Sequence, residues 1–269
     1  MPVITITRGS LSASTKLTHR LAAELNCRSL SREDLIEYGK KYGIDEFLHS
    51  ARKIMEAKPP NSWDPHAKQI QHYLTIAKAA LLDFVVQGDI IYHGLQTHFI
   101  LTDVPRVMKI KVVAPMDYRI KTLMEESEIN ENTAREHIKF VDEMRISWAK
   151  FLYGENFDDP TYYDMILNMS HLSLDAMAQI VTQMAHRPEF RLNAGTMKEI
   201  RDAHLRALVR AQLVRYPETR EIEISVVADS VTGDVKVTCQ DDSGKSTECK
   251  KRIEKALSEI ELITTLKII

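Results

Sequence analysis

Residues 3–18 read Val3-Ile4-Thr5-Ile6-Thr7-Arg8-Gly9-Ser10-Leu11-Ser12-Ala13-Ser14-Thr15-Lys16-Leu17-Thr18, and this stretch decides the fold. The apolar, β-branched run over 3–7 predicts a short buried strand. A helix is predicted near 13–26, so residues 9–16 cover the connection and the first helical turn. A strand followed by a polar loop and a helix N-terminus is an arrangement that favours binding of an anion.

The connection resembles the phosphate-binding loop G-x-x-x-x-G-K-[ST], in which backbone N–H groups surround a phosphate and the lysine adds charge. Gly9 matches the first glycine. Ser14 stands at the second glycine, and Thr15 and Lys16 occupy the last two positions in reversed order. The sequence therefore predicts a phosphate-binding loop with altered chemistry, formed by Gly9, Ser10, Ser12, Ser14, Thr15 and Lys16.

The composition is that of an ordinary globular chain of 269 residues with a net charge of −2. No overall basic field favours nucleic acid as a partner. No apolar run is long enough to cross a bilayer, and the N-terminus lacks the basic region of a signal peptide. The three cysteines are Cys27, Cys239 and Cys249, and their small number favours a reduced, cytoplasmic setting.

Strands and helices are predicted to alternate through the first two thirds of the chain. Further strands are expected over 89–92, 107–113 and 164–167, and helices over 31–42, 45–57, 64–88, 116–126, 130–152 and 174–184. Ser31 and Asn130 are expected helix N-caps. This alternation predicts an α/β domain with a mostly parallel sheet covered by helices on both faces.

The pattern changes after residue 192. A helix over 197–214, a hairpin of strands 222–228 and 234–240, a helix over 247–259 and a strand over 262–268 predict a small α+β unit. We therefore place a domain boundary near 192–196, with one domain over 1–192 and a second over 197–269. The C-terminal unit resembles a BON domain in its αββαβ order, although Ile260-Glu261-Leu262-Ile263 replaces the Gly-Val often found before the last strand. A dimerisation or regulatory appendage is the alternative.

Several segments of the first domain resemble the cytidylate kinase-like branch of the P-loop nucleoside monophosphate kinases, over roughly residues 2–185. The segments are Ile4-Thr5-Ile6-Thr7-Arg8, Leu21-Ala22-Ala23-Glu24-Leu25, Ser31-Arg32-Glu33, Ala114-Pro115-Met116-Asp117-Tyr118-Arg119-Ile120, Asp142-Glu143-Met144-Arg145 and Tyr163-Asp164-Met165-Ile166-Leu167-Asn168-Met169-Ser170. The resemblance implies a P-loop kinase-like sheet and a nucleotide, ATP or another, bound with Mg²⁺.

The resemblance also implies roles for single residues. Arg119 and the lid-like Arg145 would neutralise charge during phosphoryl transfer, together with Lys16 of the loop. Arg8 and Arg32 would lie at the phosphate and acceptor positions. An exposed or ion-paired arginine is the alternative for each of them. No acidic residue can be named as a ligand of Mg²⁺.

Three departures from the family pattern fall at three ligand-contacting places. Ser14 and Thr15 alter the loop, Ser31 replaces an acid before Arg32, and Leu95 follows Gly94 where an arginine is expected. A Cβ at a glycine position obstructs close approach of the backbone to a phosphate. Loss of selection for phosphoryl transfer explains all three departures together.

The histidines and a run of arginines each have an ordinary structural explanation. The ten histidines lack the spacing of zinc ligands, so no metal site is predicted. The arginines that recur from residue 201 onward predict a solvated basic helix face, with contact to an anionic ligand as the alternative; they are Arg201, Arg206, Arg210, Arg215 and Arg220.

Three hypotheses about function follow. The leading one is a regulatory protein that binds a nucleotide or another phosphate-bearing small molecule, with weak or no kinase activity. The second is an active kinase with altered acceptor specificity, and the third is an interaction scaffold that binds no nucleotide. The sequence leaves open the protein or ligand that the C-terminal unit binds, and whether the chain forms a homodimer.

Overall fold

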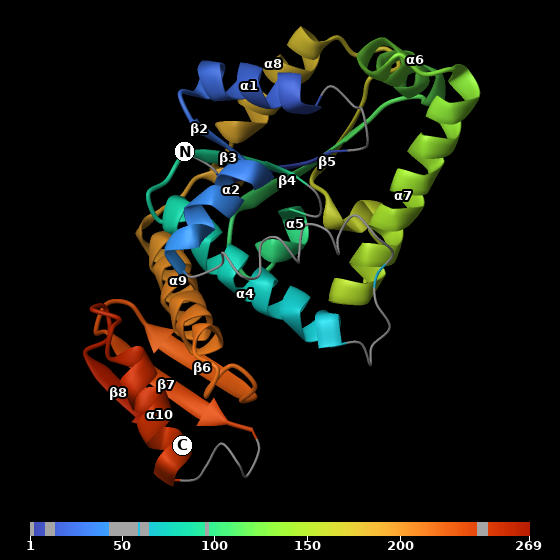
Figure 1. The fold of residues 1–269 in the computed structure, drawn as a ribbon. Coiled ribbons are helices and arrows are strands. Elements are labelled where there is room, and N and C mark those ends of the chain that lie inside the picture. Colours follow the sequence, from blue (N-terminus) through green and yellow to red (C-terminus); the bar gives the residue numbers. More distant parts are fainter. Residues whose placement is uncertain (1–2, 9–13, 43–58, 60–64, 95–96, 241–246) are drawn as a thin grey trace.

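The computed structural model describes residues 3–8, 14–42, 59, 65–94, 97–240 and 247–269 (Figure 1). A five-stranded sheet with helices on both faces forms the larger part, and a three-stranded sheet with one further helix follows at the C-terminus. The predicted fold class, an α/β sheet followed by a small α+β unit, is confirmed. Among the described residues, no helix is both long and apolar enough to cross a bilayer.

The five-stranded sheet is parallel throughout and has the order β2-β3-β1-β4-β5. Its strands are β1 (Val3–Arg8), β2 (Arg28–Ser31), β3 (Ile90–Gly94), β4 (Val107–Val113) and β5 (Met165–Asn168). Four of them lie where the sequence predicts strands. The edge strand β2 was missed because Leu30 is the one buried residue among its four, so no apolar pattern marks it.

The predicted helices of this domain are confirmed, apart from helix 45–57, which lies outside the described residues. The helices are α1 (Ser14–Leu25), α2 (Arg32–Gly39), α4 (Pro65–Val85), α5 (Thr97–Ile100), α6 (Met116–Ser127), α7 (Glu131–Tyr153) and α8 (Leu174–Ala185). The short turns η1 (Lys40–Tyr42), η2 (Pro160–Tyr162) and η3 (Pro188–Phe190) and helix α5 were not predicted. Ser31 and Asn130 are N-caps, as expected.

Each face of the sheet has its own core, because alternate residues of a strand point to opposite sides. Ile4 and Ile6 of β1 pack with α1 and α8 on one face. Val3 of the same strand packs on the other face with α4, whose small and branched residues, such as Ala80 and Leu81, are fully buried. Two cores on opposite faces hold β1 in the middle of the sheet.

The C-terminal unit has the predicted αββαβ order. Its elements are α9 (Ala194–Arg215), β6 (Ile224–Asp229), β7 (Asp234–Cys239), α10 (Thr247–Leu257) and β8 (Thr265–Ile268). Strand β7 pairs antiparallel with β6 and parallel with β8. Gly233 closes the β6–β7 turn with a φ of +74°, and a Cβ there would lie 2.4 Å from Thr264 Oγ1, so this turn requires glycine.

Helix α9 belongs to two cores, and Figure 1 shows it lying along α4 beside the three-stranded sheet. Ala203 and Ala207 pack into the core that contains α4. Leu205, Val209 and Leu213 pack into the core of the three-stranded sheet with α10. The predicted boundary near 192–196 therefore overlaps the start of α9 at Ala194, a helix that packs into both cores.

Asp83 ties α9 and the turn η1 to helix α4. Its carboxylate accepts hydrogen bonds from the Tyr42 hydroxyl, from Lys41 Nζ at 2.6 Å and from His204 Nε2 at 2.6 Å, and its side chain is 12% exposed. Burial alone would raise the pKa of Asp83, but the hydrogen bonds from His204, Lys41 and Tyr42 outweigh it and lower the pKa to about 2. The charged form of Asp83 therefore stabilises the fold.

We expect Asp83→Asn to lower the free energy of unfolding at pH 7 by about 2 kcal/mol, since it removes the charge from three hydrogen bonds. In the unfolded chain an aspartate carboxyl has a pKa of about 3.9. The difference in the free energy of unfolding between the wild type and Asp83→Asn should therefore be complete above that pH and should narrow as pH falls from about 4 to about 2. Denaturant unfolding of both proteins over this pH series measures the difference.

Asp117→Asn provides the matched control, because the side chain of Asp117 is 95% exposed. Its unfolding free energy should stay within about 0.5 kcal/mol of the wild type. An Asp83→Asn protein that unfolds like this control at pH 7 would contradict the structural role of Asp83.

Candidate functional site

The carboxyl edge of the parallel sheet gathers the residues that the sequence singled out. Ligands of open α/β sheets bind outside this edge, where the strand order reverses. Strand β1 ends there at Arg8, and α1 begins at Ser14, so the predicted phosphate-binding loop joins them at this edge. Gly9, Ser10 and Ser12 of that loop lie outside the described residues.

The first turn of α1 holds the three altered positions of the loop. Ser14 is the first residue of the helix and is buried, and its backbone carbonyl accepts a hydrogen bond of 2.8 Å from Thr18 Oγ1. Thr15 is half-buried and Lys16 is exposed. A buried side chain thus occupies the place of the second glycine, and the lysine extends toward solvent.

A cavity of about 150 Å³ lies beyond the carboxyl end of β4, and we call it the carboxyl-edge cavity. It brings together Arg119 of α6 and Arg145 of α7, the two arginines that the resemblance implied. It also contains a cation that sequence reasoning missed, Lys111 of β4. The full lining is Lys111, Val113, Ala114, Arg119, Asp142, Arg145, Ile146, Phe157 and Asp158.

Lys111 reaches this cavity from the strand beside β1. In the β1–β4 register it pairs with Thr7, one residue before the end of β1. Its Nζ donates a hydrogen bond of 2.6 Å to Asp158 Oδ1 and lies 4.8 Å from the centre of the Phe157 ring. Lysine is seldom buried without a partner, so at 7% exposure Lys111 depends on this carboxylate and this ring.

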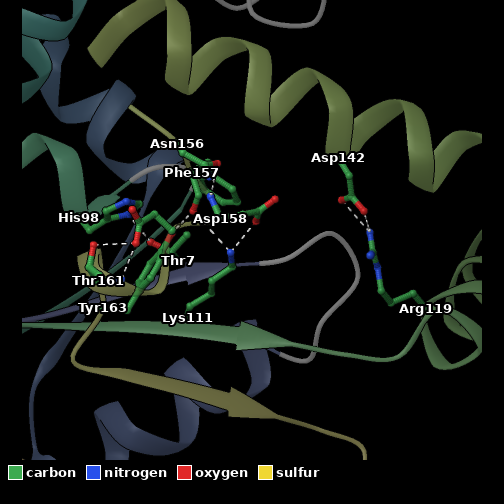
Figure 2. Close-up of polar contacts among 11 residues, drawn as sticks. Thr7, His98, Lys111, Arg119, Asp142, Asn156, Phe157, Asp158, Thr161 and Tyr163 are labelled. Atoms are coloured by element: carbon green, nitrogen blue, oxygen red, sulfur yellow. Dashed lines mark hydrogen bonds and ion pairs between the residues drawn. The ribbon is translucent and has the colours of Figure 1, made fainter. Parts of the chain in front are cut away.

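Arg119 is held in place by the helix that carries Arg145. Its Nη2 donates to both carboxylate oxygens of Asp142, at 2.8 and 2.7 Å. Figure 2 shows Arg119 and Asp142 facing each other across α6 and α7, with Lys111 turned toward Asp158. Asp142 and Arg145 lie three residues apart on α7, which places them next to each other on the same side of the helix.

A buried polar group lies behind Lys111, at the end of β1. Thr7 Oγ1 lies 3.0 Å from His98 Nδ1, and the Tyr163 hydroxyl donates to the carbonyl oxygen of Phe157 at 2.9 Å (Figure 2). Burial lowers the pKa of His98 to about 3, and Lys109 and Lys111 push it in the same direction. His98 is therefore neutral near pH 7 and places no second positive charge beside Lys111.

Histidine sequence spacing gave no hint of this placement of His98. Its Nε2 is buried and has no hydrogen-bond partner among the described residues. Within the same part of the chain, no three side chains of His, Cys, Asp or Glu lie close enough together to hold a metal ion.

The predicted acceptor-side residues lie apart from the carboxyl-edge cavity. Arg32 is the first residue of α2, and its positive charge acts on the hydroxyl of Tyr73 on α4, where it partly offsets the rise in the Tyr73 pKa that burial causes. The Ser31 hydroxyl is engaged in the helix cap, accepting from the Asp34 backbone N–H at 3.0 Å. Gly94 ends β3 in the core of the sheet, and Leu95 lies outside the described residues.

Comparison with solved structures gives matches of low sequence identity. A protein from Eubacterium ventriosum described as uncharacterized is 18% identical, with a TM-score of 0.50 over 68% of this chain and 97% of that chain. Shikimate kinase from Bacteroides thetaiotaomicron is 14% identical, with a TM-score of 0.41 over 69% and 99%. Dephospho-CoA kinase from Campylobacter jejuni is 13% identical, with a TM-score of 0.33 over 68% and 95%.

Comparison with families is more specific. No curated protein matches the chain. The model of the cytidylate kinase-like family matches residues 3–171, a span that runs from the first residue of β1 past the end of β5 and includes Lys111, Arg119 and Arg145. Because this match covers more than half of the sequence, the chain belongs to the cytidylate kinase-like family.

Proposed function

We propose that this protein binds a nucleotide or another phosphate-bearing small molecule at the carboxyl edge of its sheet, with weak or no kinase activity. The observation that carries the proposal is the carboxyl-edge cavity, in which Lys111, Arg119 and Arg145 come from three different elements. Clustered lysine and arginine side chains are the usual receptors for phosphate groups, since their hydrogen bonds are assisted by charge.

The two carboxylates of the cavity explain how these cations are held before a ligand arrives. Asp158 pairs with Lys111 at 2.6 Å and Asp142 pairs with Arg119 at 2.7 Å. A bound phosphate would compete with both carboxylates for the same N–H donors. Arg145 lines the cavity beside them and adds a third cation to the phosphate.

Weak or absent phosphoryl transfer follows in this proposal from the altered loop. Phosphoryl transfer depends on precise positioning and on charge stabilisation, so the placement of each cation matters. Lys16 is exposed on the first turn of α1, and Ser14 puts a buried side chain at a position that glycine occupies in the motif. Lys111 carries charge to the end of β1 from the neighbouring strand instead.

Mg²⁺ accompanies nucleotides in this kinase-like family, and it prefers carboxylate and water oxygens. The carboxylates of the cavity, Asp142 and Asp158, are paired with Arg119 and Lys111. These residues do not fit a protein-held Mg²⁺ site, and we assign no step to the metal.

Thermal unfolding with a panel of nucleotides and nucleoside monophosphates tests binding. A ligand present at about 100 times its dissociation constant should stabilise the protein by about 2.7 kcal/mol. We expect Arg145→Gln and Lys111→Gln each to lower the affinity for the most stabilising ligand by about tenfold or more, because each removes a charge-assisted hydrogen bond.

Arg135→Gln is the matched control, since Arg135 lies on the same helix and pairs with Glu131 at the surface. Its ligand affinity should equal that of the wild type. If no member of the panel stabilises the protein, the scaffold hypothesis is favoured. If Arg135→Gln and Arg145→Gln lose equal ligand affinity, the carboxyl-edge cavity is not the binding site.

An active kinase with altered acceptor specificity is the second candidate, and the observation that favours it is that Arg119 and Arg145 share one cavity. This candidate predicts that Lys16→Ala and Arg145→Ala each lower turnover by about a hundredfold, as expected for lost transition-state contacts. The leading proposal predicts no turnover of ATP with CMP or other phosphate acceptors near the ~1 s⁻¹ of a slow kinase. A coupled assay of ADP release decides between the two.

The remaining expectations belong to the same proposal. The C-terminal unit is proposed to resemble a BON domain and to serve as the binding module of a regulatory protein. A cytoplasmic location and a homodimer stay predictions from the sequence.

A further inference from the structure

A second positively charged cavity, of about 180 Å³, lies where α4, α9 and β6 meet, and we call it the junction cavity. Lys78 of α4 and Arg206 and Arg210 of α9 line it. Among the described residues of its lining Asp103 is the one carboxylate, and Val226 of β6 lies at the side of the three-stranded sheet. The lining therefore carries three positive charges and one negative charge.

The junction cavity is separate from the carboxyl-edge cavity. Asp103 lies in the turn that precedes β4, at the amino end of the parallel sheet, whereas the carboxyl-edge cavity follows the other end of that strand. No described residue lines both cavities. One ligand in the carboxyl-edge cavity therefore does not account for the cations of the junction cavity.

The packing of α4 against α9 holds the cations together. Asp83 near the end of α4 contacts His204 in the middle of α9, and Lys68 near the start of α4 pairs at 2.7 Å with Glu221, which follows α9, so the helices run antiparallel. Arg206 and Arg210 are four residues apart and share a helix face, where like charges repel each other. Lys78 adds a third positive charge to this face from the neighbouring helix.

Asp103 compensates only part of this charge. It pairs with Lys78 at 2.6 Å and lies 3.9 Å from Arg206. Among the described residues, Arg210 forms no hydrogen bond or ion pair, although it lines the same cavity. An anion in the cavity would give Arg210 a partner and would relieve the repulsion between the two arginines.

We propose that the junction cavity binds the phosphate or pyrophosphate group of a small anionic ligand, as a site distinct from the carboxyl edge. The cavity of about 180 Å³ is lined by Lys78, Arg206 and Arg210, whose charged N–H groups suit a phosphate or pyrophosphate group. Such a ligand would bridge α4, in the core of the α/β domain, and α9, which also forms the core of the C-terminal unit.

Calorimetric titration of the full chain with pyrophosphate tests this site, using Arg145→Gln as the background to weaken the carboxyl-edge cavity. We expect pyrophosphate still to bind in this background. Adding Arg210→Gln or Lys78→Gln should lower the affinity for pyrophosphate by about tenfold, the effect of one lost charge-assisted hydrogen bond. Adding Asp103→Asn should raise this affinity, since the competing carboxylate loses its charge.

Arg201→Gln removes one charge from an exposed position on the same helix, outside the cavity lining, and should leave the affinity unchanged. Loss of all pyrophosphate binding in Arg145→Gln alone would overturn the junction site and leave the proposed function standing. An affinity for pyrophosphate that Arg210→Gln, Lys78→Gln and Asp103→Asn all leave unchanged would overturn the junction site as well. A nucleotide affinity that Arg145→Gln leaves unchanged would instead contradict the proposed function.

Discussion

The parallel pairing of β1 between β3 and β4 is the interaction on which the rest of the structure depends. It places the carboxyl ends of three strands side by side, so that the altered loop after β1 lies next to whatever the neighbouring strands carry. The β1–β4 register pairs Thr7 with Lys111. A shift of this register by one residue would turn Lys111 to the opposite face of the sheet, away from Asp158.

This constraint changes how the altered loop is understood. Considered along the sequence, Ser14-Thr15-Lys16 is a damaged phosphate-binding motif. Considered in the fold, the end of β1 has a lysine beside it that comes from β4, and two arginines that come from the α6–α7 pair. Positive charge is therefore present at the carboxyl edge apart from the loop. Under the proposed function, this charge binds a phosphate without transferring it.

Most of the fold could be predicted from the sequence, because the strands of the sheet centre are apolar runs and helices α2 and α7 have clear caps at Ser31 and Asn130. Strand β2 could not be predicted, since it lies at the edge of the sheet and is positioned by pairing with β3.

Of the candidate site, Arg119 and Arg145 were found through the family resemblance. Lys111 was missed because it sits inside an apolar strand, where neither periodicity nor motif spacing shows which side chain reaches the carboxyl edge. His98 was missed because its burial depends on packing against Phe99 and Tyr163.

The most direct test of the central claim is a structure of the full chain with a non-hydrolysable ATP analogue. The account predicts that phosphate oxygens lie within hydrogen-bonding distance, about 3 Å, of Lys111 Nζ and of the guanidinium groups of Arg119 and Arg145. Phosphates bound by the loop and by Lys16, with Lys111 and Arg119 still paired to Asp158 and Asp142, would contradict it.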